Sequence, residues 1–137
     1  MHEFIYPLRI SYEDTDFNGY VYFPNYLKYM ERAVTNLIYE KGIRMTDLIK
    51  QDILIGVRSV QCKYFRPAQM EDEVEVVSKI HSHTEVIITW DHTIRSQKDK
   101  NYIYCHGLIE NVCFHRQQLK PMKLLPELRE LINKYAI

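Results

Sequence analysis

Three carboxylates that lie within four residues of one another are the groups in this sequence best suited to chemistry. They are Glu13, Asp14 and Asp16. Neighbouring carboxylates repel one another, which favours protonation of one of them unless donors or water relieve the repulsion. An Asn18-Gly19 pair follows and predicts a turn, since both residue types tolerate positive φ. A helix pattern starts at Pro24, and the free N–H groups of a helix start stabilise negative charge. An acid beside such a helix start is suited to acyl transfer.

The composition narrows the class of protein. The 137 residues are expected to form one domain, residues 1–137, with a core that needs no disulfide. Lys plus Arg and Asp plus Glu number 18 each, so no basic excess favours a nucleic acid partner. No apolar run approaches the length of a membrane helix, and we expect no stable membrane insertion. Three cysteines without a Cys-x-x-Cys pair predict reduced thiols in a cytoplasmic protein.

Apolar spacing predicts an α+β chain in the order β-α-β-β-β-β-α. A long helix is expected from Pro24 to Lys41, closed by Gly42. The other expected elements are strands at Phe4–Tyr12, Ile53–Phe65, Val74–His83, Glu85–Arg95 and Tyr102–His115, a short helical turn at Met45–Gln51, and a helix at Leu125–Ala136. Consecutive strands joined mostly by hairpins predict an antiparallel sheet, with the long helix covering one face. The edges of such a sheet favour oligomers.

The segment around the acids carries a longer pattern. It reads Tyr12-x-Asp14-Thr15-Asp16-x-x-Gly19-x-Val21-Tyr22-x-x-x-Tyr26, then Met30-Glu31-Arg32-Ala33, with Phe65-x-Pro67-Ala68 and Lys120-Pro121 further on. This pattern resembles the hotdog-fold acyl-CoA thioesterases of the 4-hydroxybenzoyl-CoA thioesterase type, including the YbgC-like branch, over nearly the whole chain. The resemblance implies a hotdog fold, in which an antiparallel sheet wraps around one long central helix. It also implies hydrolysis of an acyl-CoA thioester to a free acid and CoA.

The resemblance assigns roles to single residues. The second acid of the Asp-x-Asp pair, Asp16, is implied to attack the thioester carbonyl or to activate water. The backbone N–H of Phe23 is implied to receive the carbonyl oxygen, and Pro24 beside it has no N–H to offer. Tyr12 matches a tyrosine near the catalytic acid of the YbgC-like branch. The other residues expected to contact the substrate are Gly19, Tyr22 and Asn25.

One position departs from the YbgC-like branch, which often carries a histidine where this chain has Phe23. A His–Asp mechanism is therefore not expected, and Asp16 would act alone. From chemistry without the resemblance, Asp16 could simply hold turn amides. Asp14 is expected to hold the loop, and Tyr12 either packs or offers its hydroxyl. Glu31 is expected to be ion-paired or solvated.

The CoA phosphates require cations, and we hypothesise that Arg58 and Arg116 supply them. In the family the CoA lies across a subunit interface, so a homodimer or a homotetramer, as a dimer of dimers, is expected. No cofactor is implied, and the spacing of the histidines predicts no metal site. Two alternatives stay open: a thioesterase acting on acyl carrier protein, and a non-enzymatic hotdog protein that binds acyl groups.

Overall fold

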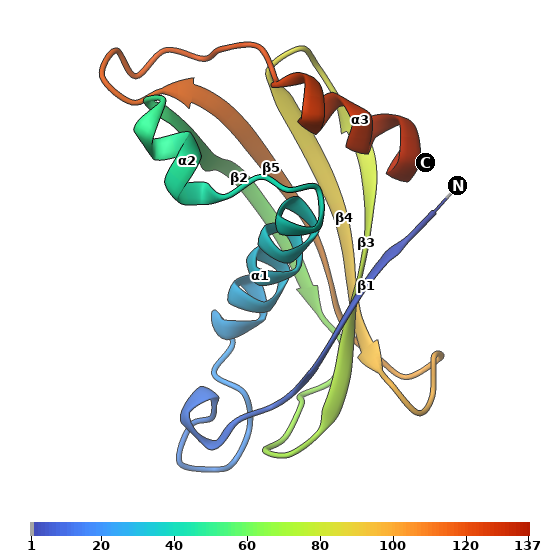
Figure 1. Ribbon diagram of the computed structural model, residues 1–137. Helices are drawn as coiled ribbons and strands as arrows, with labels where there is room; N and C mark the ends of the chain where they lie inside the picture. The colour runs from blue at the N-terminus through green and yellow to red at the C-terminus, as the bar shows by residue number, and fades with distance from the viewer. Residues whose placement is uncertain (1) are drawn as a thin grey trace.

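The computed structural model describes residues 2–137, and one antiparallel sheet holds the five strands of this part of the chain. The strands are β1 (Phe4–Arg9), β2 (Ile53–Tyr64), β3 (Glu73–His83), β4 (Ile87–Ser96) and β5 (Ile103–His115). Their order across the sheet is β1-β3-β4-β5-β2. The helices are α1 (Asn25–Glu40), α2 (Met45–Lys50) and α3 (Pro126–Tyr135). The sheet curves around α1, and the chain ends lie close together at one side (Figure 1).

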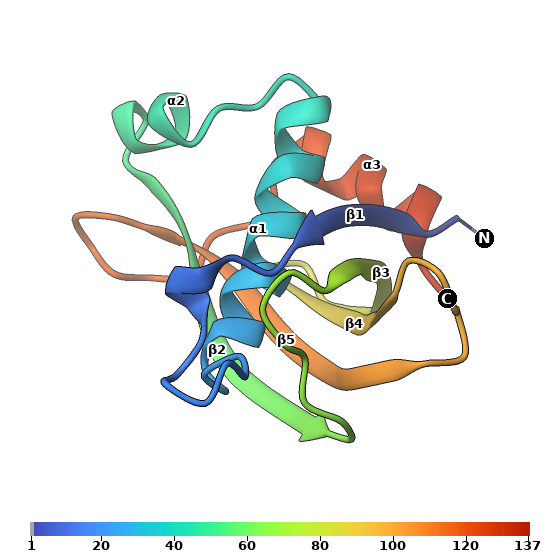
Figure 2. The same cartoon turned by 90° about the horizontal axis from the view of Figure 1, so that it is seen from below.

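The central helix α1 lies in the hollow of the curved sheet, as the view from below shows (Figure 2). Its buried side chains recur three or four residues apart, which gives one apolar face. They are Tyr26, Tyr29, Met30, Ala33, Val34, Leu37 and Ile38. This face packs on inward side chains of the sheet such as Val76, Trp90 and Ile109, each at most 1% exposed. The predicted hotdog arrangement, a sheet wrapped around one helix, is confirmed.

The C-terminal end of α1 is closed by Gly42, as the sequence predicted. Gly42 adopts φ +81°, donates its N–H to the carbonyl of Tyr39, and is followed by an Ile43 N–H that bonds to Ile38. These two bonds form a Schellman motif, for which a glycine is favoured because it has no Cβ to clash. At the other end, Pro24 precedes the first helical residue instead of being it.

The structure corrects one expectation about the strands. The first strand ends at Arg9, because Ile10 exchanges backbone hydrogen bonds of 2.9 Å with Glu71 and Asp72 of the β2–β3 connection. Tyr12 therefore begins a 3-10 turn, and its expected place in a strand was wrong. The strand β2 pairs with β5 at the sheet edge and forms no hairpin with β3. The β3–β4 and β4–β5 hairpins are as predicted.

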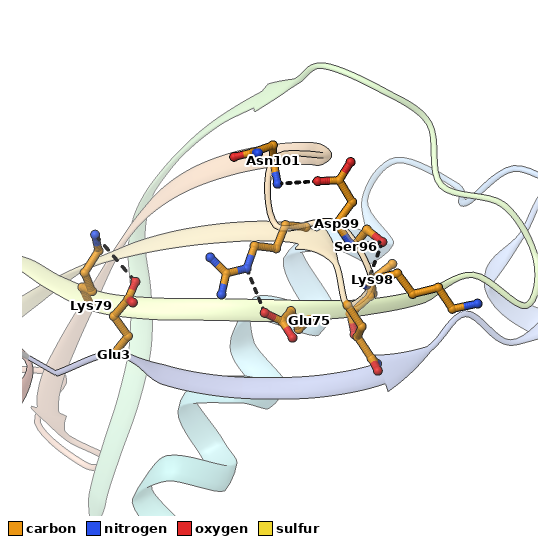
Figure 3. A network of polar contacts seen from close by, with 10 residues as sticks. Glu3, Glu75, Lys79, Ser96, Lys98, Asp99 and Asn101 are labelled. Carbon is orange, nitrogen blue, oxygen red and sulfur yellow. Dashed lines mark hydrogen bonds and ion pairs between the residues drawn. The ribbon is translucent and has the colours of Figure 1, made fainter.

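Polar side chains on the outer face join β1, β3 and β4 (Figure 3). Arg95 of β4 donates to Glu75 of β3 at 2.8 Å, and both side chains are mostly buried. Lys79 and Glu3 form a longer ion pair of 3.9 Å. The hydroxyl of Ser96 accepts two N–H groups of the β4–β5 turn. These contacts fix the strand register on the side away from α1.

A polar pair lies under the middle of α1. The Ser78 hydroxyl and the Nδ1 of His92 are 2.7 Å apart, both side chains are fully buried, and His92 stacks on Trp90. Within the described residues, no partner reaches the Nε2 of His92. Burial lowers the pKa of His92 to about 3. The folded protein therefore holds this imidazole neutral while the unfolded chain takes up a proton below pH about 6.5.

We expect acid to destabilise the fold through this histidine. Since the pKa of His92 is lower in the folded protein, its contribution to stability is complete above pH about 6.5 and is lost as the pH falls toward 3. Between pH 7 and pH 5 the wild type should lose roughly 1 to 2 kcal/mol more unfolding free energy than His92→Gln. Denaturant unfolding followed by the fluorescence of Trp90, the one tryptophan, measures this. His83→Gln, at an exposed strand end, should behave like wild type, and equal losses in all three proteins would contradict the expectation.

Candidate active site

A short loop carries the three acids to the start of α1. The N–H of Asp16 donates to Tyr20 at 2.8 Å, and the N–H of Gly19 returns to Asp16 at 3.0 Å. Gly19 has φ +84°, a conformation that side chains disfavour, so the predicted turn is present. The N–H of Val21 donates to Ala68, which ties the loop to the β2–β3 connection. The loop is thus held from both sides while its tip stays in solvent.

The carboxylate of Asp16 is fixed through one oxygen. Its Oδ1 accepts the N–H of Asn18 at 2.9 Å and of Tyr20 at 3.3 Å. No donor among residues 2–137 pairs with the other oxygen, Oδ2, and the residue is exposed. The turn-holding interpretation and the chemical one are therefore compatible, because one oxygen orients the group and the second is free to act.

The backbone of Asp14 holds the loop, and the structural role expected for its carboxylate stays a prediction. Its carbonyl accepts the N–H of Tyr22 at 3.0 Å and the side-chain amide of Asn25 at 2.8 Å. Its half-buried carboxylate lies near the hydroxyl of Tyr29, and burial together with this carboxylate raises the pKa of Tyr29. The side chain of Asn25 thus holds the loop, a task that the sequence did not indicate.

Phe23 stands directly before the helix and offers a free amide. Among the described residues, no acceptor pairs with its N–H, although the neighbouring N–H groups of Tyr22 and Asn25 are both bonded. Pro24 has no N–H. The Phe23 amide is thus an available donor at a helix start, where the dipole favours negative charge. The residue as a whole is 59% exposed.

Two predicted tyrosines are open to solvent. Tyr12 is 79% exposed and Tyr22 is 56% exposed. The carbonyl of Tyr12 accepts the N–H and the hydroxyl of Thr15, so its backbone shapes the loop while its ring stands free. One chain alone therefore leaves these rings uncovered.

A cleft of about 260 Å³ opens beside the helix start. Its lining comes from the end of the loop, the first turn of α1 and the end of β2. The lining residues are Val21, Phe23, Tyr26, Tyr64, Phe65, Arg66 and Pro67. Sequence reasoning missed Tyr26 and Tyr64 as site residues, while Arg66 belonged to a basic set considered for the CoA phosphates. The motif contains Tyr26, which could have been found there, but only the sheet order brings Tyr64 to this place.

The two expected phosphate ligands lie away from the loop. Arg58 sits at a bulge in β2 and pairs with Glu110 at 3.5 Å. Arg116 follows β5 and donates its N–H to Asp52, beside the start of β2. The 12 residues of β2 separate that end from the Phe23 end, a length of roughly 35 to 40 Å along the strand. A single chain does not bring Arg116 to Asp16, and the roles of both arginines stay predictions.

Glu31 is neither ion-paired nor fully solvated. Burial raises its pKa, the amide of Asn111 on β5 lies beside it, and no partner in the described chain reaches its Oε1. The expected ion pair with a neighbour on α1 is thus not formed among the described residues. The carboxyl lies about two turns into α1, beyond the loop that holds Asp16.

The remaining polar side chains give few further candidates for catalysis or metal binding. His106 pairs with Asp91 at 3.1 Å on the outer face of the sheet. Across residues 2–137, no three His, Cys, Asp or Glu side chains gather as a metal site would require, and the lack of a metal stays a prediction. The cysteines of this part of the chain are free thiols. No helix in the same range is long and apolar enough to cross a membrane.

Residues 10–132 match the profile of the thioesterase-like superfamily. The chain is 28% identical over 121 residues to the acyl-CoA thioester hydrolase YbgC of Escherichia coli, covering 88% of this chain and 89% of that protein. It is 31% identical over 80 residues to the acyl-CoA thioesterase YbgC of Helicobacter pylori, covering 58% of each. Its fold resembles that of a 1,4-dihydroxy-2-naphthoyl-CoA thioesterase from Synechocystis, with a TM-score of 0.89, 20% identity and 96% coverage of both chains.

Proposed function

Because the chain belongs to the thioesterase-like superfamily, we propose that it is an acyl-CoA thioesterase, which hydrolyses a thioester to a free acid and CoA. The observation that carries this proposal is that one segment contains both a carboxylate and a free backbone donor. Asp16 has one carboxylate oxygen without a hydrogen-bond donor among the described residues. Seven residues later, Phe23 has a free N–H at the start of α1, and both residues lie inside the matched range 10–132. The YbgC relatives, which are named for this reaction, support the same activity here.

Asp16 supplies the carboxylate chemistry in this proposal. Its Oδ1 is occupied by turn amides, so Oδ2 is the oxygen that meets the substrate. In one route Oδ2 attacks the carbonyl carbon, the C–S bond breaks, and water then cleaves the acyl anhydride. In the other route Oδ2 takes a proton from a water molecule that attacks the same carbon. Both routes consume one water and yield the acid and the CoA thiol.

The Phe23 amide supplies electrostatic stabilisation. The carbonyl oxygen gains negative charge as its carbon becomes tetrahedral, and a fixed N–H donor at that position contributes roughly 100-fold or more in rate. The N–H is free and lies at the positive end of α1, which supports this role. Tyr12, Gly19 and Tyr22, on the loop that carries Asp16, are the further residues proposed to contact the substrate.

A second copy of the chain completes the site through β2. The edge strand β1 is six residues long and contains Pro7, features that discourage pairing. The edge strand β2 is 12 residues long, contains no proline, and exposes Val57 by 49% and Val60 by 41%. Two β2 strands paired antiparallel would form a homodimer, and two dimers a homotetramer. Such pairing would bring the Arg116 end of one copy toward the Phe23 end of the other.

We expect the protein to release CoA from acyl-CoA thioesters at enzymatic rates. A thiol-reactive dye reports release from aryl-, short-, medium- and long-chain acyl-CoA, and thioesters of an acyl carrier protein form a parallel series. Turnover of the CoA series supports the proposal, and Asp16→Asn purified in the same way excludes a contaminating enzyme. Turnover of the carrier-protein series alone would favour the carrier-protein alternative. Binding without turnover in either series would favour a non-enzymatic acyl-binding protein.

A further inference from the structure

Aromatic rings from two distant segments pack around Phe23. Its ring meets Tyr64 edge to face, with centroids 6.1 Å apart and planes at 87°. Tyr64 also packs on Tyr26 at 5.5 Å. Tyr26 is only 3% exposed, and its hydroxyl accepts the N–H of Ala68 at 2.9 Å. The end of β2 thus packs on the start of α1 through one buried ring, Tyr26, and two partly exposed ones, Tyr64 and Phe23.

The hydroxyl of Tyr64 reaches the backbone at the helix start. It donates to the carbonyl of Phe23 at 3.3 Å, which is long for an O–H···O bond. That carbonyl otherwise accepts only the Tyr26 N–H, at a long 3.4 Å, among the described residues. The Leu27 N–H, which would complete a regular helical turn, bonds to Pro24 instead. The Phe23 carbonyl therefore depends on a side chain that lies 41 residues away in the sequence.

Both peptide planes that flank Phe23 are held from outside the residue. The preceding plane is fixed because the carbonyl of Tyr22 accepts the N–H of Asn25 at 2.9 Å. The following plane is fixed by Tyr64, through its hydroxyl and its ring. The Phe23 N–H lies in the preceding plane. The following plane, which Tyr64 contacts, limits the φ and ψ through which the preceding plane can turn relative to α1.

We propose that Tyr64 is a positioning residue that aims the Phe23 N–H at the thioester carbonyl. This inference rests on the proposed function and adds a residue to it from outside the loop that carries the acids. Burial raises the pKa of Tyr64 to about 12, so its hydroxyl stays a donor at neutral and mildly alkaline pH. An amide held in advance stabilises the developing charge without reorganising during the reaction.

Tyr64→Phe tests this role because it keeps the ring and removes only the hydroxyl. We expect kcat for acyl-CoA hydrolysis to fall about three- to tenfold, the effect of one hydrogen bond, with KM within about twofold of wild type. The matched control is Tyr39→Phe, which removes a hydroxyl from an exposed ring near the other end of α1. That control should keep the wild-type kcat.

A spectroscopic measurement tests whether Tyr64 orients the Phe23 N–H or only contributes packing. The infrared band of a ¹³C-labelled thioester carbonyl is recorded in acyl-CoA bound to Asp16→Asn, with and without Tyr64→Phe. We expect a band at lower frequency than in free acyl-CoA, and a return toward the free value when the Tyr64 hydroxyl is absent. An unchanged kcat, or a reduced kcat with an unchanged band, would overturn the inference. Lack of turnover by the wild type would overturn the proposed function instead.

Discussion

Asp16→Asn is expected to lower kcat for acyl-CoA hydrolysis by about 100- to 10,000-fold while the protein keeps its fold. Asparagine retains an oxygen that can accept the N–H groups of Asn18 and Tyr20, so the turn survives. Its amide nitrogen neither attacks a thioester nor takes a proton from water. Initial rates of CoA release, measured beside thermal unfolding of the same samples, separate the loss of chemistry from any loss of structure.

Glu13→Gln is the matched control for this substitution. Glu13 is an exposed carboxylate in the same loop, so its change alters the local charge equally, and kcat should stay within about twofold of wild type. A variant Asp16→Asn that kept more than about a tenth of the wild-type kcat would contradict the role of Asp16. The carboxyl groups of Asp14 and Glu31 would then be the next candidates. Glu31 already has a raised pKa because of burial.

The double substitution Val57→Lys and Val60→Lys is expected to convert the proposed dimer to a monomer and to lower CoA release at least about tenfold. Lysines on a sheet edge oppose pairing, and two copies would bring like charges together. The side chains of Val57 and Val60 are 49% and 41% exposed in the single chain, so the change should spare the core. Analytical ultracentrifugation measures the mass, and the activity is followed at the same concentration.

Ile5→Lys provides the comparison on the opposite edge of the sheet. Ile5 lies on β1 and is 43% exposed, so this substitution adds one lysine, half the charge of the double variant, to a similarly exposed strand. Its mass and activity should equal those of wild type. A wild type that is monomeric and fully active, or a double variant that stays dimeric and active, would exclude β2 as the surface that completes the site.

The long helix and its closure could be read from the sequence because both depend on local rules. Apolar side chains spaced three and four apart from Tyr26 to Ile38 can face one core only as a helix. Gly42 supplies the positive φ that closes it. The turn at Gly19 is local in the same sense. These features needed no knowledge of the neighbouring strands.

The contacts that shape the site around Phe23 depend on the sheet order, which local patterns do not contain. Tyr64 reaches Phe23 because β2 lies at the edge, paired with β5, instead of forming a hairpin with β3. The first strand stops early because Ile10 bonds to the β2–β3 connection, and this moves Tyr12 into a turn. Arg58 and Arg116 belong to different parts of the sequence, and only the register of β2 with β5 shows that Arg116 lies beside the start of β2, away from Phe23.

A crystal structure of Asp16→Asn with a bound acyl-CoA tests the central claim most directly, since the slow variant should retain its substrate. The thioester oxygen is predicted to lie within hydrogen-bond distance of the Phe23 N–H, with the side chain of residue 16 facing the carbonyl carbon. The CoA should leave the site between two copies joined at β2. A thioester bound elsewhere, with the Phe23 N–H still free, would contradict the account.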